Sequence, residues 1–325
     1  MRCTPIDNVT MDMQAQGHSI EPQKRREVAV TFDDLPVISV TRHDIAFYRE
    51  ITNKLVEAIT ANTLPAIGFV NENKLHRRRR LPKFWGTLDG ARVALLQQWL
   101  DEGLELGNHT FSHPDLHTTP PDSFRTDVIR GETVISKLLR RKGMRLRYFR
   151  HPFLHTGTDL ETKRNFEEFL AGRGYRIAPV SINTSDWIFA AAYAKAAERG
   201  DQEMMREVAA AYIPFTEARF DYCEKQSVAL FGYEIKQILL LHANVLNADQ
   251  LSDLLQALKR RGYSFISLEE ALSDKAYASP DEYTGEKGIT WLHRWAWTAG
   301  KQEAFFADEP VTPEFVMKEA GVTEE

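Results

Sequence analysis

The sequence predicts an α/β protein in which helices connect the strands of a parallel sheet, either open or closed as a barrel. Short runs of Val, Ile, Leu and Phe alternate along the chain with longer segments whose apolar residues recur at helical spacing. Strands separated by helices of about 10 to 20 residues are typical of parallel sheets. Short polar motifs follow several of the apolar runs, which would place them together at one edge of such a sheet.

Strands are predicted where a short apolar run is bounded by polar or turn-forming residues. In chain order they cover residues 28–32, 66–70, 104–108, 146–150, 175–183, 237–241 and 263–266. Each later run is preceded by a segment long enough to cross back over the sheet. This spacing favours parallel neighbours over hairpins.

Helices are predicted from apolar spacing and from helix propensity. In the first of them, Ile45, Tyr48 and Ile51 begin a stripe on one face. Gly103 and Gly172 follow two of the helices as stop signals. The predicted helices cover residues 43–61, 91–102, 122–139, 161–171, 190–212 and 248–260.

The two ends of the chain lack this alternation. Residues 1–27 are polar and aperiodic, which predicts an N-terminal arm without an apolar export signal. Residues 273–325 form a C-terminal extension, and we expect it to pack on the body of the protein. It contains Trp291, Trp295 and Trp297. We interpret them as packing residues, with sugar stacking as the alternative.

Composition gives no indication of a nucleic-acid-binding, disulfide-rich or membrane-spanning protein. The formal net charge of -5 offers no basic surface for nucleic acid, and the run His-Arg-Arg-Arg-Arg at 76–80 is interpreted as a solvated loop. Cys3 and Cys223 are the 2 cysteines, so neither a disulfide framework nor a Cys-based zinc site is indicated. No apolar stretch approaches the roughly 18 residues of a membrane span.

Two carboxylates and two histidines form the candidate metal site. Asp33 and Asp34 follow the first predicted strand, and His109 and His113 follow the third. Two His and one Asp leave open positions for water and substrate, as a catalytic metal requires. Taken alone, an Asp-Asp pair is more often a turn or a helix cap. The combination of both motifs at strand ends favours the metal site.

Two further histidine pairs stand four residues apart. His113 and His117 form one of them, and His151 and His155 form the other. His117 and His155 lack a matching acid in the sequence pattern. We therefore interpret them as loop residues or as residues surrounding the site.

The ordered motifs resemble those of the polysaccharide deacetylases, the NodB homology domain of carbohydrate esterase family 4. They are Thr-Phe-Asp-Asp at 31–34, His-Thr-Phe-Ser-His at 109–113, Arg-His-Pro-Phe at 150–153, Ser-Asp-Trp at 185–187 and Leu-Leu-His at 240–242. The resemblance covers about residues 28–271. It implies a distorted (β/α)7 barrel over residues 28–272, with a helical insertion around 190–235.

The resemblance also implies a ligand set and a base. Asp34, His109 and His113 would bind one divalent metal, most often Zn²⁺, with Co²⁺, Ni²⁺ and Mn²⁺ as alternatives. Asp33 would be the general base, held by Arg150 in a bidentate ion pair. Metal coordination lowers the pKa of water from 15.7 to about 7. That shift is on the order of 12 kcal/mol toward the nucleophile.

The remaining roles implied by the resemblance concern the substrate. The backbone N–H of Phe153 would bind the oxyanion, and His242, oriented and charged by Asp186, would protonate the leaving group. Trp187 and Leu240 would form apolar walls around the acetyl methyl. An ionised base and a protonated acid together predict a bell-shaped pH profile.

Three positions depart from the family pattern. Phe153 stands where Tyr is most frequent, so a phenol contact to substrate is lost although the backbone donor remains. Asn183 replaces a frequent Asp, and Ala243-Asn244 follow His242 where Asp is common. None of these changes removes a ligand, the base or the acid.

The functional hypothesis is a metal-dependent carbohydrate deacetylase acting on N-acetyl or O-acetyl groups of a polysaccharide or oligosaccharide. A binding module that holds acetylated glycan without hydrolysing it is one alternative. A metal-dependent hydrolase of another bond, such as a non-sugar amide, is the other. Family habit places such enzymes outside the cytoplasm. The sequence names neither the glycan nor the oligomeric state.

Overall fold

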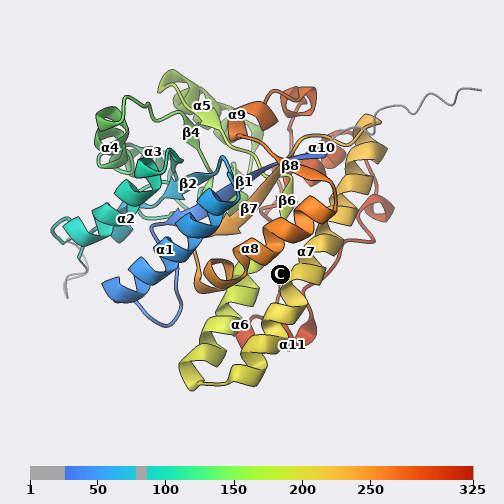
Figure 1. The fold of residues 1–325 in the computed structure, drawn as a ribbon. Coiled ribbons are helices and arrows are strands. Elements are labelled where there is room, and N and C mark those ends of the chain that lie inside the picture. The colour runs from blue at the N-terminus through green and yellow to red at the C-terminus, as the bar shows by residue number, and fades with distance from the viewer. Residues whose placement is uncertain (1–25, 78–85, 325) are drawn as a thin grey trace, which may run out of the picture.

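The computed structural model describes residues 26–77 and 86–324, and it confirms the α/β prediction. The strands form one sheet in the order β5-β4-β3-β2-β1-β7-β6, with β8 also beside β1, and each strand pairing is parallel (Figure 1). The strands are β1 (Arg26–Leu35), β2 (Ile67–Val70), β3 (Glu105–Asn108), β4 (Tyr148–Phe149), β5 (Arg176–Ile177), β6 (Ile182–Asn183), β7 (Gln237–His242) and β8 (Tyr263–Phe265).

Helices connect most of these strands, and α1 packs against both α2 and α8 over one face of the sheet (Figure 1). Among the described residues, no helix is both long and apolar enough to cross a membrane. The helices are α1 (Ile45–Ala61), α2 (Gly90–Asp101), α3 (Pro121–Arg130), α4 (Ile135–Arg141), α5 (Leu160–Gly172), α6 (Asp186–Arg199), α7 (Gln202–Phe231), α8 (Val245–Arg260), α9 (Leu268–Ala271), α10 (Trp291–Thr298) and α11 (Glu314–Ala320).

The sheet curls but stays open along one seam. Strands β5 and β6 lie at opposite ends of the strand order, yet residues 178–181 alone separate them in the chain. The sequence predicts a single strand over 175–183, and this is wrong. The segment leaves one end of the curled sheet, crosses the seam, and joins the other end beside β7. The result is a parallel half-barrel.

Alternation along β1 explains how polar residues enter the barrel. Val28, Val30 and Phe32 belong to the core cluster that contains the apolar residues of α1, α2 and α8. Successive strand residues point to opposite faces, so Thr31 and Asp33 face the interior of the curl. Both are buried. Buried polar groups need hydrogen-bond or ion-pair partners, and β7 and the loop after β4 supply them.

Two of the predicted helices are each divided into two in the structure. The helix predicted over 190–212 is split into α6 and α7 because Gly200 adopts a left-handed conformation, with φ 73°, at the end of α6. Asp201 then caps α7 by accepting from the Met204 N–H at 3.0 Å. The helix predicted over 122–139 is likewise split into α3 and α4.

The C-terminal segment packs on the body through aromatic side chains. Trp291 and Trp295 are buried, and Trp295 meets Phe231 edge to face with ring centroids 5.5 Å apart. Trp297 is half exposed and stacks on Phe306. None of the three tryptophans lines the pocket that contains Asp33.

Two predictions concern residues outside the described part of the chain. The polar arm over 1–27 falls mainly on residues 1–25, outside the described residues, as does part of the basic run 76–80. Residue Arg26 belongs to β1, and its guanidinium pairs with Glu234 at 2.8 Å. The first strand therefore begins before the predicted residue 28.

Candidate active site

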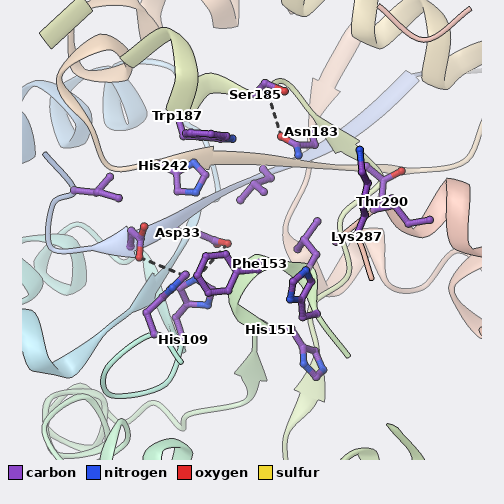
Figure 2. A pocket seen from close by; sticks show the side chains of 18 of the residues that line it. Asp33, His109, His151, Phe153, Asn183, Ser185, Trp187, His242, Lys287 and Thr290 are labelled. Carbon is purple, nitrogen blue, oxygen red and sulfur yellow. Dashed lines mark hydrogen bonds and ion pairs between the residues drawn. The ribbon is translucent and has the colours of Figure 1, made fainter. Parts of the chain in front are cut away.

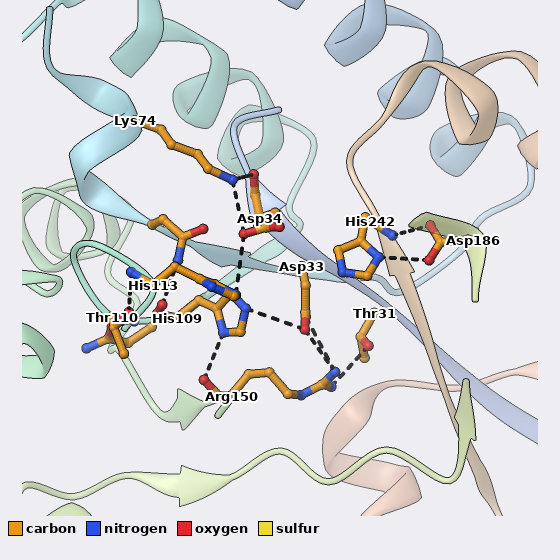
Figure 3. A network of polar contacts seen from close by, with 12 residues as sticks. Thr31, Asp33, Asp34, Lys74, His109, Thr110, His113, Arg150, Asp186 and His242 are labelled. Atoms are coloured by element: carbon orange, nitrogen blue, oxygen red, sulfur yellow. Dashed lines mark hydrogen bonds and ion pairs between the residues drawn. The ribbon is translucent and has the colours of Figure 1, made fainter. Parts of the chain in front are cut away.

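Residues from five distant parts of the sequence meet at the carboxyl edge of the sheet (Figure 3). Asp33 lies in β1, His109 follows β3, Arg150 follows β4, Asp186 begins α6, and His242 ends β7. Asp33 and His242 are register partners on neighbouring parallel strands. The carboxyl ends of parallel strands share one edge, which explains the convergence.

An irregularity in β1 brings its two carboxylates to one pocket. The strand continues to Leu35, so the prediction that it ends at Phe32 is wrong, but its register with β2 shifts between these two residues. Asp34 lies inside the shift and has φ 70°. Such a bulge re-aims a side chain that strict alternation would send to the other face. Asp33 and Asp34 therefore line the same pocket.

Asp34, His109 and His113 could hold a metal ion. Each offers one ligand atom, and these atoms all lie within 4.8 Å of one another. Burial lowers the pKa of both imidazoles, so they are neutral, which is the form that binds metals. Burial alone would raise the pKa of Asp34, but nearby positive charge, that of Lys74 foremost, outweighs it and keeps this carboxylate ionised.

The hydrogen bonds of His109 suit a metal ligand. Its Nδ1 lies 2.8 Å from the Arg150 carbonyl, which accepts a hydrogen bond from it, and this leaves Nε2 to face Asp33 and Asp34 (Figure 3). Metal-binding histidines are usually fixed through the second ring nitrogen in this way. The His113 N–H donates to the Thr110 hydroxyl at 3.0 Å, which fixes the loop that carries the second imidazole.

Asp115, His117 and His155 form a second group with ligand atoms within 4.8 Å. The expectation that His117 and His155 lack a matching acid is wrong, since Asp115 accepts from His155 Nδ1 at 2.7 Å. However, the His117 and His155 rings stack with centroids 3.8 Å apart and planes 2° apart. An imidazole lone pair lies in its ring plane, so parallel stacked rings do not converge on one ion. The His109 and His113 rings, by contrast, are 75° apart.

Lys74 is a site residue that the sequence analysis missed. Its ammonium donates to Asp34 Oδ1 at 3.0 Å and to the Asp34 carbonyl at 2.9 Å. It lies in a short 3-10 helix after β2, where no periodicity marks it. The ammonium stabilises ionised Asp34 and faces the same carboxylate that a metal would bind.

Asp33 and Arg150 form a buried ion pair whose geometry differs from the expectation. One guanidinium nitrogen lies 3.4 Å from both Asp33 oxygens, and the other donates to the Thr31 hydroxyl at 3.1 Å. The predicted bidentate pair is therefore wrong, because Thr31 takes the second nitrogen. Burial raises the pKa of Asp33 to about 6 although Arg150 opposes the shift.

Asp186 and His242 form the second buried pair. Asp186 is fully buried and accepts from His242 Nδ1 at 2.7 Å and from the His242 N–H at 2.8 Å. The Asn244 and Asn247 amides donate to Oδ2, the oxygen that also accepts from the His242 N–H. Burial alone would lower the pKa of His242, but the Asp186 charge outweighs it and raises this pKa to about 9. The imidazole is thus protonated at neutral pH.

A pocket of about 1000 Å³ opens beside these groups (Figure 2). Phe153 and Trp187 line it with exposed rings, 52% and 41% accessible, whereas Leu240 is buried in its wall. Phe153 has φ 56°, in the left-handed region, and its ring contacts His113 edge to face at 4.5 Å. Two exposed aromatic rings at a polar site suit a ligand with both apolar and polar faces.

Comparisons with known proteins agree on one family. The family described as polysaccharide deacetylase matches residues 12–166. The peptidoglycan-N-acetylglucosamine deacetylase of Bacillus cereus is 26% identical over 166 residues, which cover 51% of this chain and 48% of that protein. The chitin deacetylase of Colletotrichum lindemuthianum is 25% identical over 162 residues, or 49% and 52% of the two chains. The chain spans about half the length of these curated relatives.

Solved structures with a similar fold have low sequence identity to this chain. A pseudoenzyme of carbohydrate esterase family 4 from Bacillus anthracis is 15% identical, with a TM-score of 0.47. The match covers 77% of this chain and 66% of that chain.

Proposed function

The chain belongs to the polysaccharide deacetylase family, and on this premise we propose that it is a metal-dependent deacetylase of acetylated glycans. Asp34, His109 and His113 would hold the metal. When bound, a divalent metal polarises a carbonyl oxygen and lowers the pKa of water to about 7. Zn²⁺ is the proposed ion, since two imidazoles and one carboxylate suit it.

The chain's own residues would carry the protons. Asp33, ionised above a pKa of about 6, accepts a proton from the attacking water. As the water attacks the acetyl carbon, the Phe153 N–H donates to the oxyanion that forms on the carbonyl oxygen. His242, charged by Asp186, then protonates the departing sugar nitrogen or oxygen, which an amide leaving group needs. Trp187 and Leu240 would enclose the acetyl methyl.

The observation that carries this proposal is the pairing of Asp33 with His242 across two neighbouring strands. One buried carboxylate has a raised pKa, and one buried imidazole also has a raised pKa. Two titratable groups with such different environments at one pocket are typical of an acid and a base. A binding module would need neither of these groups nor the four donors that surround Asp186.

The first test pairs metal content with acetate release. We expect purified protein to contain about one metal per chain and to release acetate from at least one N-acetylated or O-acetylated oligosaccharide. Chelation should abolish the release and zinc should restore it. Bound metal without acetate from any sugar would favour the binding module or a non-sugar amide. Absence of metal from the purified and zinc-treated protein would refute the proposal.

The pH dependence provides a second prediction. We expect kcat/KM to rise as Asp33 ionises near pH 6 and to fall as His242 loses its proton near pH 9. A bound cation would move both limbs to lower pH. Asp186→Asn removes the charge that keeps the imidazole protonated, so the descending limb should shift to lower pH while the ascending limb stays in place. An unchanged descending limb would contradict the role of Asp186.

A further inference from the structure

The pocket has a wall that the polysaccharide deacetylase motifs do not supply. Residues 286–290 and 309–311, both in the C-terminal extension, line it together with the motif residues. We call these two segments the end wall. Figure 2 shows Asp33 and His109 on one side of the pocket and Lys287 and Thr290 on the other. A ligand that reaches the proposed acid and base therefore also approaches the end wall.

The first segment of the end wall packs directly on the loop that carries Phe153. A Cβ added at Gly288 would lie 1.7 Å from the Phe153 carbonyl oxygen, so the two backbones are in close contact. The Glu286 carbonyl accepts from His117 Nδ1 at 3.3 Å. The Trp291 N–H, next to this segment, donates to the Val180 carbonyl at 2.7 Å.

One buried arginine ties the end wall to the sheet, and a second fixes the helix that follows its first segment. Arg219 of α7 donates to the Asn183 carbonyl at 2.8 Å and to the Pro310 carbonyl at 2.9 Å, which ties the second segment to β6. Arg294 of α10 donates to the Leu154 carbonyl at 3.4 Å and to Asp281 at 2.8 Å. Opening the second segment would take the Pro310 carbonyl away from the buried Arg219 guanidinium, which is costly. The end wall is therefore a fixed boundary of the pocket.

Thr290 marks a place for a ligand on the end wall. Its side chain is 96% buried, and its hydroxyl has no hydrogen-bond partner among the described residues although it belongs to the pocket lining. A buried hydroxyl without a partner is unfavourable, so a ligand that bonded to it would be favoured. Thr52, in α1, also has a buried unpartnered hydroxyl but lies outside the pocket.

We propose that the end wall stops a glycan chain inside the pocket, so that the protein deacetylates a sugar at or next to a chain end, with Thr290 bonded to that terminal sugar. This inference rests on the proposed deacetylase function and specifies its substrate. The pocket volume of about 1000 Å³ lies at the upper end of small-molecule sites. A short oligosaccharide fits this volume, whereas a chain that extends toward residues 286–290 or 309–311 would meet the end wall.

Positional mapping of acetate loss tests the proposal. N-acetylglucosamine oligomers of two to six sugars, labelled at the reducing end, would be digested and the deacetylated positions located by mass spectrometry. We expect loss at one terminal position, at least 100-fold faster than at internal sugars or in polymeric chitin. Comparable rates at internal sugars would overturn the end-wall inference while leaving the deacetylase proposal standing. Absence of acetate from every sugar would instead refute the deacetylase, and the end-wall inference with it.

A matched pair of isosteric variants tests the contact with Thr290. The binding measurement uses the Asp33→Asn background, which removes turnover, and the oligomer that the wild type deacetylates. Thr290→Val should weaken its binding by about two- to tenfold, since one neutral hydrogen bond is lost. Thr52→Val should leave this affinity unchanged. Both variants should retain or raise the Tm, because each removes a buried unpartnered hydroxyl. Equal affinities for the two variants would overturn the role of Thr290.

Discussion

Asp33→Asn is expected to lower kcat for acetate release by about 10²- to 10⁴-fold, the range that a general base contributes. The amide cannot accept the proton that the carboxylate takes. Asp34, His109 and His113 are unchanged, so metal content should stay at about one per chain. The measurements are steady-state acetate release and metal analysis of the same sample.

The same substitution leaves the Arg150 guanidinium buried without its counter-charge. Arg150 is fully buried, and Asp33 supplies both oxygens at 3.4 Å. Removing one partner of a buried ion pair costs about 3 to 5 kcal/mol, so the variant should also have a lower Tm. Combining Asp33→Asn with Arg150→Met removes both charges and should recover stability without recovering activity.

This pair of variants separates catalysis from stability. Asp122→Asn is the matched control, because Asp122 is an exposed acid in α3 that lies outside the pocket. It should have wild-type kcat and Tm. A single Asp33→Asn variant that keeps its rate within tenfold of wild type would contradict the assignment of Asp33 as the base.

The sequence was sufficient to predict the alternation of strands and helices because the apolar patterns are local. The same patterns could not predict where the sheet stays open. Residues 175–183 read as one strand, since their composition is continuous, but the seam between β5 and β6 is set by the curl of the whole sheet. Likewise, the left-handed cap at Gly200 divides a segment that propensity alone would join.

The sequence predicts the site residues that lie in motifs. It does not predict the residues that reach the site only through tertiary contacts. Asp33, Asp34, His109 and His113 share a pocket, as the strand-end argument requires. Lys74 carries no sequence signal, because a 3-10 turn aims it at Asp34. The end wall was equally hidden, since its segments follow no periodic pattern and reach the pocket through tertiary packing.

His113→Ala is expected to remove the metal and with it the activity. His113 supplies one of three ligand atoms within 4.8 Å, and Ala leaves His109 and Asp34, which is too few for tight binding. Affinity should fall by more than about 100-fold, the upper end of the loss seen when an outer-shell partner is removed. Metal analysis and zinc titration of the purified variant measure this. Its stability should change little, because the side chain is partly exposed.

His117→Ala distinguishes this site from the second group of ligand atoms. His117 stacks on His155 with parallel planes, so we expect the variant to keep its metal while His113→Ala loses it. The opposite pattern would place the ion at Asp115, His117 and His155.

A variant of Lys74 provides a second way to tell the two groups apart, because its ammonium contacts Asp34. An ion at the first site must displace or accommodate that charge, so Lys74→Met should tighten zinc binding there and leave the second group unaffected.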